Sequence, residues 1–152
     1  FRFGDGRLTT SLIGRTNRKI AEELSPFPTN FKSSRKQYII RASEIKSLGM
    51  KEGYIKKLGF NVTNGNNDNF NVKIGMANIT PQSNYYSFKS VREVYSENNI
   101  SWSNPDNAII TLPLKDDGFY YNGISDLLIQ VCMTNLTPYN GNDSDIFSIF
   151  SL

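Results

Sequence analysis

Residues 107–133 read NAIITLPLKDDGFYYNGISDLLIQVCM, and this stretch decides the fold. Two apolar runs, 107–114 and 126–133, flank a polar connection that is rich in Asp, Asn and Gly. Apolar runs of this length bounded by turn residues predict two strands joined by a turn. Successive residues of the second run are apolar, so we expect that strand to be buried on both faces of a sheet.

Length and composition predict one globular domain. The chain has 152 residues, of which 38% are hydrophobic and 20% charged, and it is long enough to bury a core. No apolar run approaches the roughly 20 residues that cross a bilayer, so we expect a chain that does not span a membrane. The sequence begins at Phe1 without Met, and we interpret it as processed or trimmed.

Charge is unevenly distributed along the chain. Residues 1–57 hold 13 Lys or Arg against 5 Asp or Glu (13 − 5 = +8), and residues 58–152 hold 4 against 9 (4 − 9 = −5). Either these charges mix on the folded surface, or the basic end of one molecule meets the acidic end of the next. The scattered basic residues match no nucleic-acid module, so we expect no nucleic-acid partner.

The remaining sequence predicts further short strands and little helix. We expect strands at 37–42, 54–62, 70–76, 88–95 and 146–152, loops at 77–86 and 98–106, and a bulge at 56–57. One short helix is expected at 44–48, with Ser43 as its N-cap and Gly49 ending it in a left-handed conformation.

These elements predict an all-β fold, because no alternation of helix and strand indicates parallel βαβ units. We expect an antiparallel two-sheet sandwich, jelly-roll-like, with one short helix. Residues 1–35 are expected to form an N-terminal arm or edge segment, and residues 36–152 the sandwich domain.

Catalytic chemistry finds little support in the sequence. The chain has no histidine, the commonest general base and metal ligand. Its single cysteine, Cys132, lies in an apolar strand, where a thiol packs as a small hydrophobe. Two groups of carboxylates leave a carboxylate pair open, but we favour the interpretation that they satisfy turn N–H groups. These are Asp116, Asp117 and Asp126, and Glu93 and Glu97. We therefore predict no catalytic residues and a protein that is not an enzyme.

Calcium is the metal that these side chains would favour, because only oxygen ligands are plentiful. The candidate ligands are Asp116, Asp117, Asn142, Asp143 and Asp145. The alternative is that the same side chains only hydrogen-bond their own turns. No cofactor other than this calcium is expected.

Aromatic residues fall in or beside the predicted loops. Exposed rings there would bind the faces of sugars or a protein partner. The candidate ligand-binding residues are Tyr85, Tyr86, Trp102, Tyr120 and Tyr121. The alternative is that most of these rings close the open ends of the sandwich.

Five short motifs occur in a fixed order between residues 38 and 127. They are YIIRASEI at 38–45 with Gly49 and Gly53 after it, IKKLGFNV at 55–62, FNVKIG at 70–75, VY at 94–95, and FYYNGISDL at 119–127 followed by Cys132. In this order they resemble a β-sandwich module of secreted and cell-surface proteins of Bacteroidota that is associated with type IX secretion.

The resemblance implies export to the cell surface or medium, a β-sandwich and a role in adhesion or in surface or filament assembly. The alternative function is that of a carbohydrate-binding module of a secreted protein. The expected partners are other copies of the chain or a larger cell-surface protein, and glycans under the alternative. We expect any self-association to use residues 1–24, since exposed sheet edges pair readily with other chains.

Overall fold

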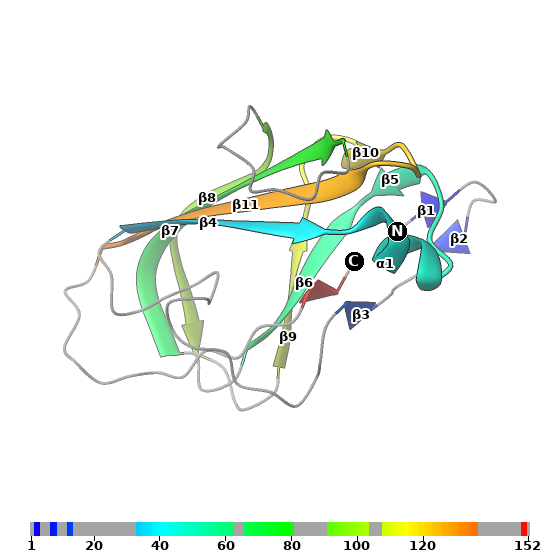
Figure 1. The fold of residues 1–152 in the computed structure, drawn as a ribbon. Helices are drawn as coiled ribbons and strands as arrows, with labels where there is room; N and C mark the ends of the chain where they lie inside the picture. The colour runs from blue at the N-terminus through cyan, green and yellow to red at the C-terminus, as the bar shows by residue number, and fades with distance from the viewer. Residues whose placement is uncertain are drawn as a thin grey trace.

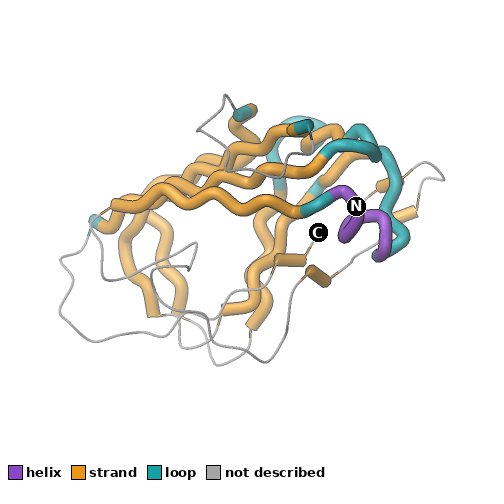
Figure 2. Tube along the Cα trace, viewed as in Figure 1, coloured by secondary structure: helices purple, strands orange, loops and turns teal. Residues whose placement is uncertain are grey.

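Antiparallel strands account for most of the computed structural model (Figures 1 and 2). The structure describes residues 2–3, 7–8, 12–13, 33–62, 66–80, 91–103, 108–136 and 150–151. Strands joined by turns and one six-residue helix make up these segments. No helix among them is long and apolar enough to cross a membrane.

The longest strands form one four-stranded sheet, in the order β4-β11-β7-β8. Its members are β4 (Ser33–Ile40), β11 (Asp126–Asn135), β7 (Asn66–Ile79) and β8 (Arg92–Ser103). β11 pairs antiparallel with β4 on one side and with β7 on the other, so that Leu127 lies opposite both Ile40 and Asn78. The second apolar run of the sequence is therefore a central strand.

The remaining strands form two further four-stranded sheets. One has the order β10-β5-β1-β2 and contains β10 (Phe119–Tyr121), β5 (Gly53–Ile55), β1 (Arg2–Phe3) and β2 (Arg7–Leu8). The other has the order β3-β12-β6-β9 and contains β3 (Leu12–Ile13), β12 (Phe150–Ser151), β6 (Lys57–Val62) and β9 (Ala108–Pro113). Only Lys56 separates β5 from β6, and its carbonyl accepts a 2.9 Å hydrogen bond from the Leu114 amide.

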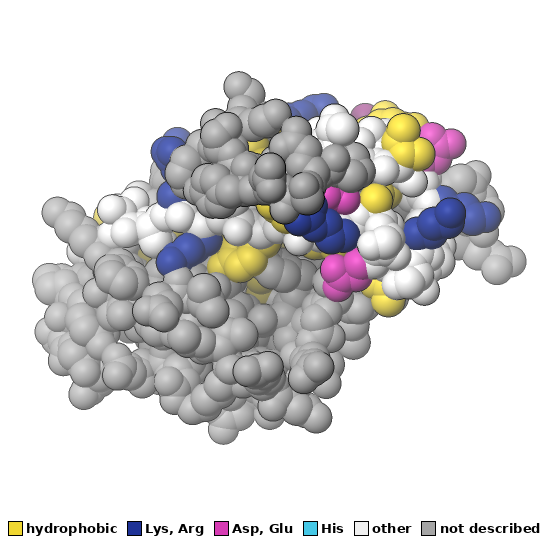
Figure 3. All heavy atoms as spheres, in the orientation of Figure 1, with side chains coloured by type: hydrophobic (Ala, Val, Ile, Leu, Met, Phe, Trp, Pro, Cys, Tyr) yellow, Lys and Arg dark blue, Asp and Glu magenta, His cyan; other side chains and the backbone are white. Residues whose placement is uncertain are grey.

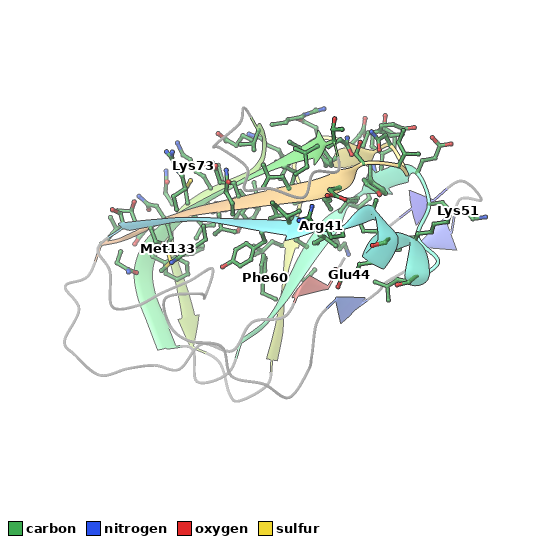
Figure 4. The ribbon with its side chains drawn as sticks, in the orientation of Figure 1. Arg41, Glu44, Lys51, Phe60, Lys73 and Met133 are labelled. Atoms are coloured by element: carbon green, nitrogen blue, oxygen red, sulfur yellow. The ribbon has the colours of Figure 1, made fainter. Side chains whose placement is uncertain are left out.

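The core lies between these layers. Phe60 on β6 points toward the sheet that contains β4 and β11 (Figure 4). On β11, alternate residues join this core, and Leu128 between them packs with Ile79 on the opposite face of the sheet. The expected burial of β11 on both faces is confirmed at that position. The main cluster also includes Leu58, Phe70, Val72, Ile74, Met76, Val94, Leu112, Ile129, Val131 and Met133.

The prediction of an all-β antiparallel fold with one short helix is confirmed. At 56–57, where a bulge was expected, Lys56 instead separates β5, which pairs with β10, from β6, which pairs with β9. Three hydrogen-bonded sheets stand where two were expected, because that interruption divides the second layer. The division into an arm of residues 1–35 and a domain of residues 36–152 stays a prediction.

Strand lengths were underestimated. β7 extends to Ile79 and β8 to Ser103, so the loops expected at 77–86 and 98–106 begin later. The pairing between β7 and β8 has register shifts, and Asn99 on β8 has a positive φ of 54°. Residues 88–90 and 146–149, expected to be strand, lie outside the described residues.

The helix α1 (Ala42–Ser47) begins two residues earlier than expected. Its N-cap is Arg41, not Ser43, and Arg41 makes no side-chain cap of its own. Gly49 follows the helix with φ +76°, as predicted. The acceptor at the start of the helix comes from β11: the Asp126 Oδ1 atom accepts a 2.8 Å hydrogen bond from the Ala42 amide.

Candidate functional site

Two tyrosines stand side by side on the solvent face of the β5–β10 pair. Tyr54 on β5 lies opposite Tyr120 on β10 in the antiparallel register. Their ring centroids are 5.3 Å apart with an interplanar angle of 62°, an edge-to-face arrangement. The exposed fractions are 44% for Tyr54 and 43% for Tyr120, so both rings are open to solvent. We call these two residues the tyrosine pair.

Strand alternation places the tyrosine pair outside. Successive side chains of a strand point to opposite faces. On β10, Phe119 and Tyr121 are buried and Tyr120 between them is exposed. On β5, Ile55 is buried and its neighbour Tyr54 is exposed. The buried neighbours anchor both short strands in the core, so the exposed rings have a firm support.

Charged groups flank the tyrosine pair on both sides. The Tyr120 hydroxyl donates a 2.9 Å hydrogen bond to the Glu52 carboxylate, and this bond raises the pKa of Tyr120 above its ordinary value. On the other side, the Lys56 Nζ atom lies 5.0 Å from the centre of the Tyr54 ring. The same ammonium group donates to the Asp117 carbonyl oxygen and lies 4.0 Å from the Asp117 carboxylate.

A hydrogen-bonded turn follows β10 directly. The Asn122 Oδ1 atom accepts hydrogen bonds from the amides of Ile124 at 3.0 Å and Ser125 at 2.9 Å. Its Nδ2 atom donates to the Ser125 hydroxyl at 2.8 Å. Gly123 has φ +79°, a left-handed conformation that favours glycine. This turn presents Ile124 to solvent with 77% of its surface exposed.

Asn78 on β7 ties the tyrosine pair to the other layer. Its Nδ2 atom donates a 2.9 Å hydrogen bond to the Tyr120 carbonyl, and its Oδ1 atom accepts a 3.3 Å bond from the Asn122 amide. One side chain therefore fixes the backbone on both sides of Tyr121. This bridge between the sheets therefore helps to fix the position of Tyr120.

Asp126, the first residue of β11, is buried near the start of α1. Its side chain is 2% exposed and forms a 2.8 Å ion pair with Arg41, whose side chain is 46% exposed. Figure 4 places Arg41 where β4 ends and α1 begins. Asp126 thus joins the start of β11 to the start of the helix.

The predicted ligand-binding residues differ in exposure and in the elements to which they belong. Tyr120 is exposed, whereas Tyr121 is 2% exposed and its hydroxyl donates to the Ser125 carbonyl at 2.8 Å. Burial raises the pKa of Tyr121, and its ring is not available as a surface platform, which corrects that expectation. Trp102 belongs to β8 and not to a loop. Tyr85 and Tyr86 lie outside the described residues.

Tyr54 was missed by the sequence prediction. The sequence prediction placed residues 54–62 in one strand, in which Ile55 is out of phase. In that strand, the alternation that exposes Tyr54 could not be recognised. The signal was present, because a separate strand ending at Ile55 would have buried that residue and exposed Tyr54.

Of the predicted calcium ligands, the structure describes only Asp116 and Asp117. Asp116, with φ +56°, and Asp117, whose side chain is 95% exposed, lie in the turn after β9. Within the described part of the chain, no group of three or more His, Cys, Asp or Glu side chains could hold a metal ion. Asn142, Asp143 and Asp145 lie outside it. A calcium site therefore stays a prediction.

Other carboxylates at this end are engaged with cations. Glu93 accepts a 2.8 Å hydrogen bond from Lys115, and this contact lowers the pKa of Glu93. A general acid requires the opposite shift, toward neutral pH. Glu93 thus lacks the environment that a general acid needs.

A pocket of about 310 Å³ lies toward the other end of β4 and β11. The Ser34 hydroxyl near it is buried without a hydrogen-bond partner in the structure. Among the described residues that line the pocket there is no carboxylate. Its lining residues are Ser33, Ser34, Arg35, Cys132, Met133 and Thr134.

The surface around α1 mixes apolar, basic and acidic side chains without one dominant charge (Figure 3). The tyrosine pair, with the exposed Ile124 beside it in sequence, is the feature there that is best suited to contact a ligand. Comparison with protein-family models, with curated proteins and with solved structures finds no match for the chain. Its function must therefore be argued from this site.

Proposed function

We propose that the chain is a non-catalytic extracellular module that acts in adhesion or in the assembly of a cell-surface structure. The observation that carries this proposal is the tyrosine pair, two neighbouring rings held open to solvent on a hydrogen-bonded support. Rigid, exposed aromatic side chains supply contact area at little entropic cost, which favours a binding role. Export is supported by the sequence resemblance alone.

The absence of an enzyme activity is part of the same proposal. No histidine occurs in the sequence, and the carboxylates Glu93 and Asp126 are held by Lys115 and Arg41. The alternative of a carbohydrate-binding module uses the same tyrosine pair, because aromatic rings can stack on sugars.

Binding to a natural surface tests the main proposal. Purified wild-type protein and a Tyr54→Ala/Tyr120→Ala variant would be titrated onto whole cells or immobilised surface polymers from the source. The matched control is Leu136→Ala, since Leu136 is also exposed, at 51%, and follows the far end of β11. We expect the double variant alone to lose binding. Equal binding by all three proteins would refute an adhesive role for this surface.

Assembly with other copies, or with a larger surface protein, is proposed to use residues 1–24. In the described part of that segment, β1 adds to the edge of β5 with Arg2 opposite Tyr54 and Phe3 opposite Gly53. A two-residue strand is a weak attachment that another copy could replace. Sedimentation of the full chain and of a chain lacking residues 1–24, at low and high salt, would test this. Monomers under all conditions would exclude self-association.

A further inference from the structure

The exposed side chains at the β5–β10 end share the features of a site for one class of ligand. We propose that Tyr120, Tyr54, Glu52 and Lys56 form a subsite for one neutral pyranose residue of a glycan, with the sugar ring stacked on Tyr120. This inference rests on the proposed binding function and names its ligand. The four residues come from two segments, residues 52–56 and β10, that the β5–β10 pairing and the Glu52–Tyr120 hydrogen bond bring together.

The geometry assigns stacking to Tyr120. Lys56 already lies over the Tyr54 ring, with its Nζ atom 5.0 Å from the centroid. The Tyr120 ring is 43% exposed, and its hydroxyl is held by Glu52. The C–H groups on one face of a pyranose carry partial positive charge, which the negative face of an aromatic ring attracts. The Tyr54 ring, inclined at 62°, would form a side wall beside the stacked sugar.

Both flanks of the subsite can hydrogen-bond sugar hydroxyl groups. A carboxylate has about four acceptor positions, and one hydrogen bond to Glu52 is described, from Tyr120. An ammonium group has three donors, and Lys56 directs one of them at the Asp117 carbonyl oxygen. An acceptor on one side and a donor on the other match a hydroxyl group, which needs both.

Charge favours a neutral ligand. Glu52 and Asp117 are acidic, Lys56 is basic, and the basic residue Arg2 lies opposite Tyr54 in the register of β1 and β5, so neither sign of charge dominates among these residues. A polyanion such as a sulfated glycan or nucleic acid would gain little from a surface without an excess of positive charge. A neutral sugar carries no charge that must be desolvated, so it loses nothing in a site of mixed sign.

Size favours a sugar over a protein. The exposed large apolar side chains of this region are Tyr54, Tyr120 and Ile124. A stable protein interface buries about 800 Å² on each partner, built from some 20–30 residues a side. Two rings with two polar neighbours offer much less, an area suited to one or two sugar residues.

The support of Tyr120 is fixed before a ligand arrives. Asn78 bonds its carbonyl, Glu52 bonds its hydroxyl, and Phe119 and Tyr121 on either side are buried. Groups that are already ordered lose little conformational entropy on binding. A shallow subsite of this kind can therefore hold a sugar with few contacts.

The test is titration calorimetry of the intact chain with cellohexaose, mannohexaose and laminarihexaose as neutral probes. For the probe that binds the wild type, Tyr120→Ala is expected to weaken binding at least about tenfold, and Tyr54→Ala less. Tyr120→Phe keeps the ring and is expected to lose no more than about threefold. Leu136→Ala is the control for a distant exposed residue, and the melting temperature of each variant confirms its fold.

Three results would overturn the inference: unchanged affinity in Tyr120→Ala, tighter binding of a sulfated oligosaccharide than of any neutral probe, or no binding of any neutral probe. In the last case, continued loss of cell-surface binding by the Tyr54→Ala/Tyr120→Ala variant would leave the adhesive function standing, with a protein as partner. If the chain binds a sugar through Tyr120 but does not attach to cells, the sugar subsite is supported and the adhesive function is refuted.

Discussion

Removing the carboxylate of Asp126 should destabilise the fold more than any change to the exposed tyrosine pair. In Asp126→Ala, the Ala42 amide at the start of α1 loses its 2.8 Å acceptor and Arg41 loses its 2.8 Å ion-pair partner. Loss of an N-cap acceptor costs about 0.5–2 kcal/mol. A hydrogen bond to a charged group contributes about 1.5–3 kcal/mol.

The expected total lies toward the lower end of that sum. Arg41 is 46% exposed, so water replaces part of what its guanidinium group loses. We therefore expect Asp126→Ala to lower the free energy of unfolding by about 2–4 kcal/mol. For a chain of this length each kcal/mol moves the melting temperature by about 2–4 °C, which gives a fall of roughly 5–15 °C.

Asp126→Asn separates the two contributions. The amide oxygen can still accept from Ala42, but the charge that pairs with Arg41 is gone, so we expect about half of the loss seen with Asp126→Ala. Thermal unfolding followed by circular dichroism measures both variants, with Arg41→Met completing a double-mutant cycle. A fall of less than about 2 °C for Asp126→Ala would contradict the view that Asp126 joins β11 to the helix.

Three further changes have clear expected outcomes. Gly118→Ala should lower the free energy of unfolding, measured by urea denaturation, more than Gly49→Ala does. Both glycines have positive φ, but a Cβ at Gly118 would meet a β5 carbonyl oxygen at 2.2 Å, whereas Gly49 faces open space. Equal effects would mean that backbone conformation alone matters. Gly75→Ala should destabilise the fold because its Cβ would come within 2.3 Å of Val91. Adding Val91→Ala should recover part of the lost free energy of unfolding, and strictly additive losses would show that the two side chains do not compete for space. Burial raises the pKa of Tyr38, so its contribution to stability is complete below about pH 10 and is lost as pH rises through the folded-state pKa. Tyr38→Phe should therefore flatten the alkaline fall in melting temperature, and an unchanged profile would assign that fall to other groups.

The sequence predicted those elements whose pattern is local. β7 was recognised because Phe70, Val72, Ile74 and Met76 alternate with polar or small residues, and all four are buried. The end of α1 was recognised because a glycine after a short helix commonly takes a left-handed conformation, as Gly49 does. In each case the information lies within a few neighbouring residues.

The elements that were missed depend on distant partners. Residues 96–99 of β8 are polar and exposed, so they carry no hydrophobic signal, and their strand conformation comes from pairing with β7. β10 has three residues, and it is a strand because it pairs with β5, more than sixty positions earlier. Ser43 looked like a helix cap by local rules, but the acceptor comes from Asp126. Such contacts are set by tertiary structure, which overrides local preference.

The candidate site shows the same division. Tyr120 was identified from sequence because it lies in a turn-rich stretch, but the feature that makes it a candidate surface is the neighbouring Tyr54 across the β5–β10 register. Tyr121 is its immediate neighbour and has the same side chain, yet strand alternation buries it. Residue type alone could not separate the two, because the separation requires knowing which face of a three-residue strand meets the core.

The binding surface and the fold share hydrogen bonds at this end of the molecule. Asn78 on the central sheet holds the backbone of Tyr120 and of Asn122, and Asn122 in turn holds the turn that presents Ile124. The position of the exposed residues is therefore set by amide side chains that need not touch a ligand themselves. For the same reason the segment 119–127 has to satisfy two requirements at once: it supplies core residues to β10 and β11, and it fixes the orientation of the tyrosine ring on which the proposed sugar contact depends.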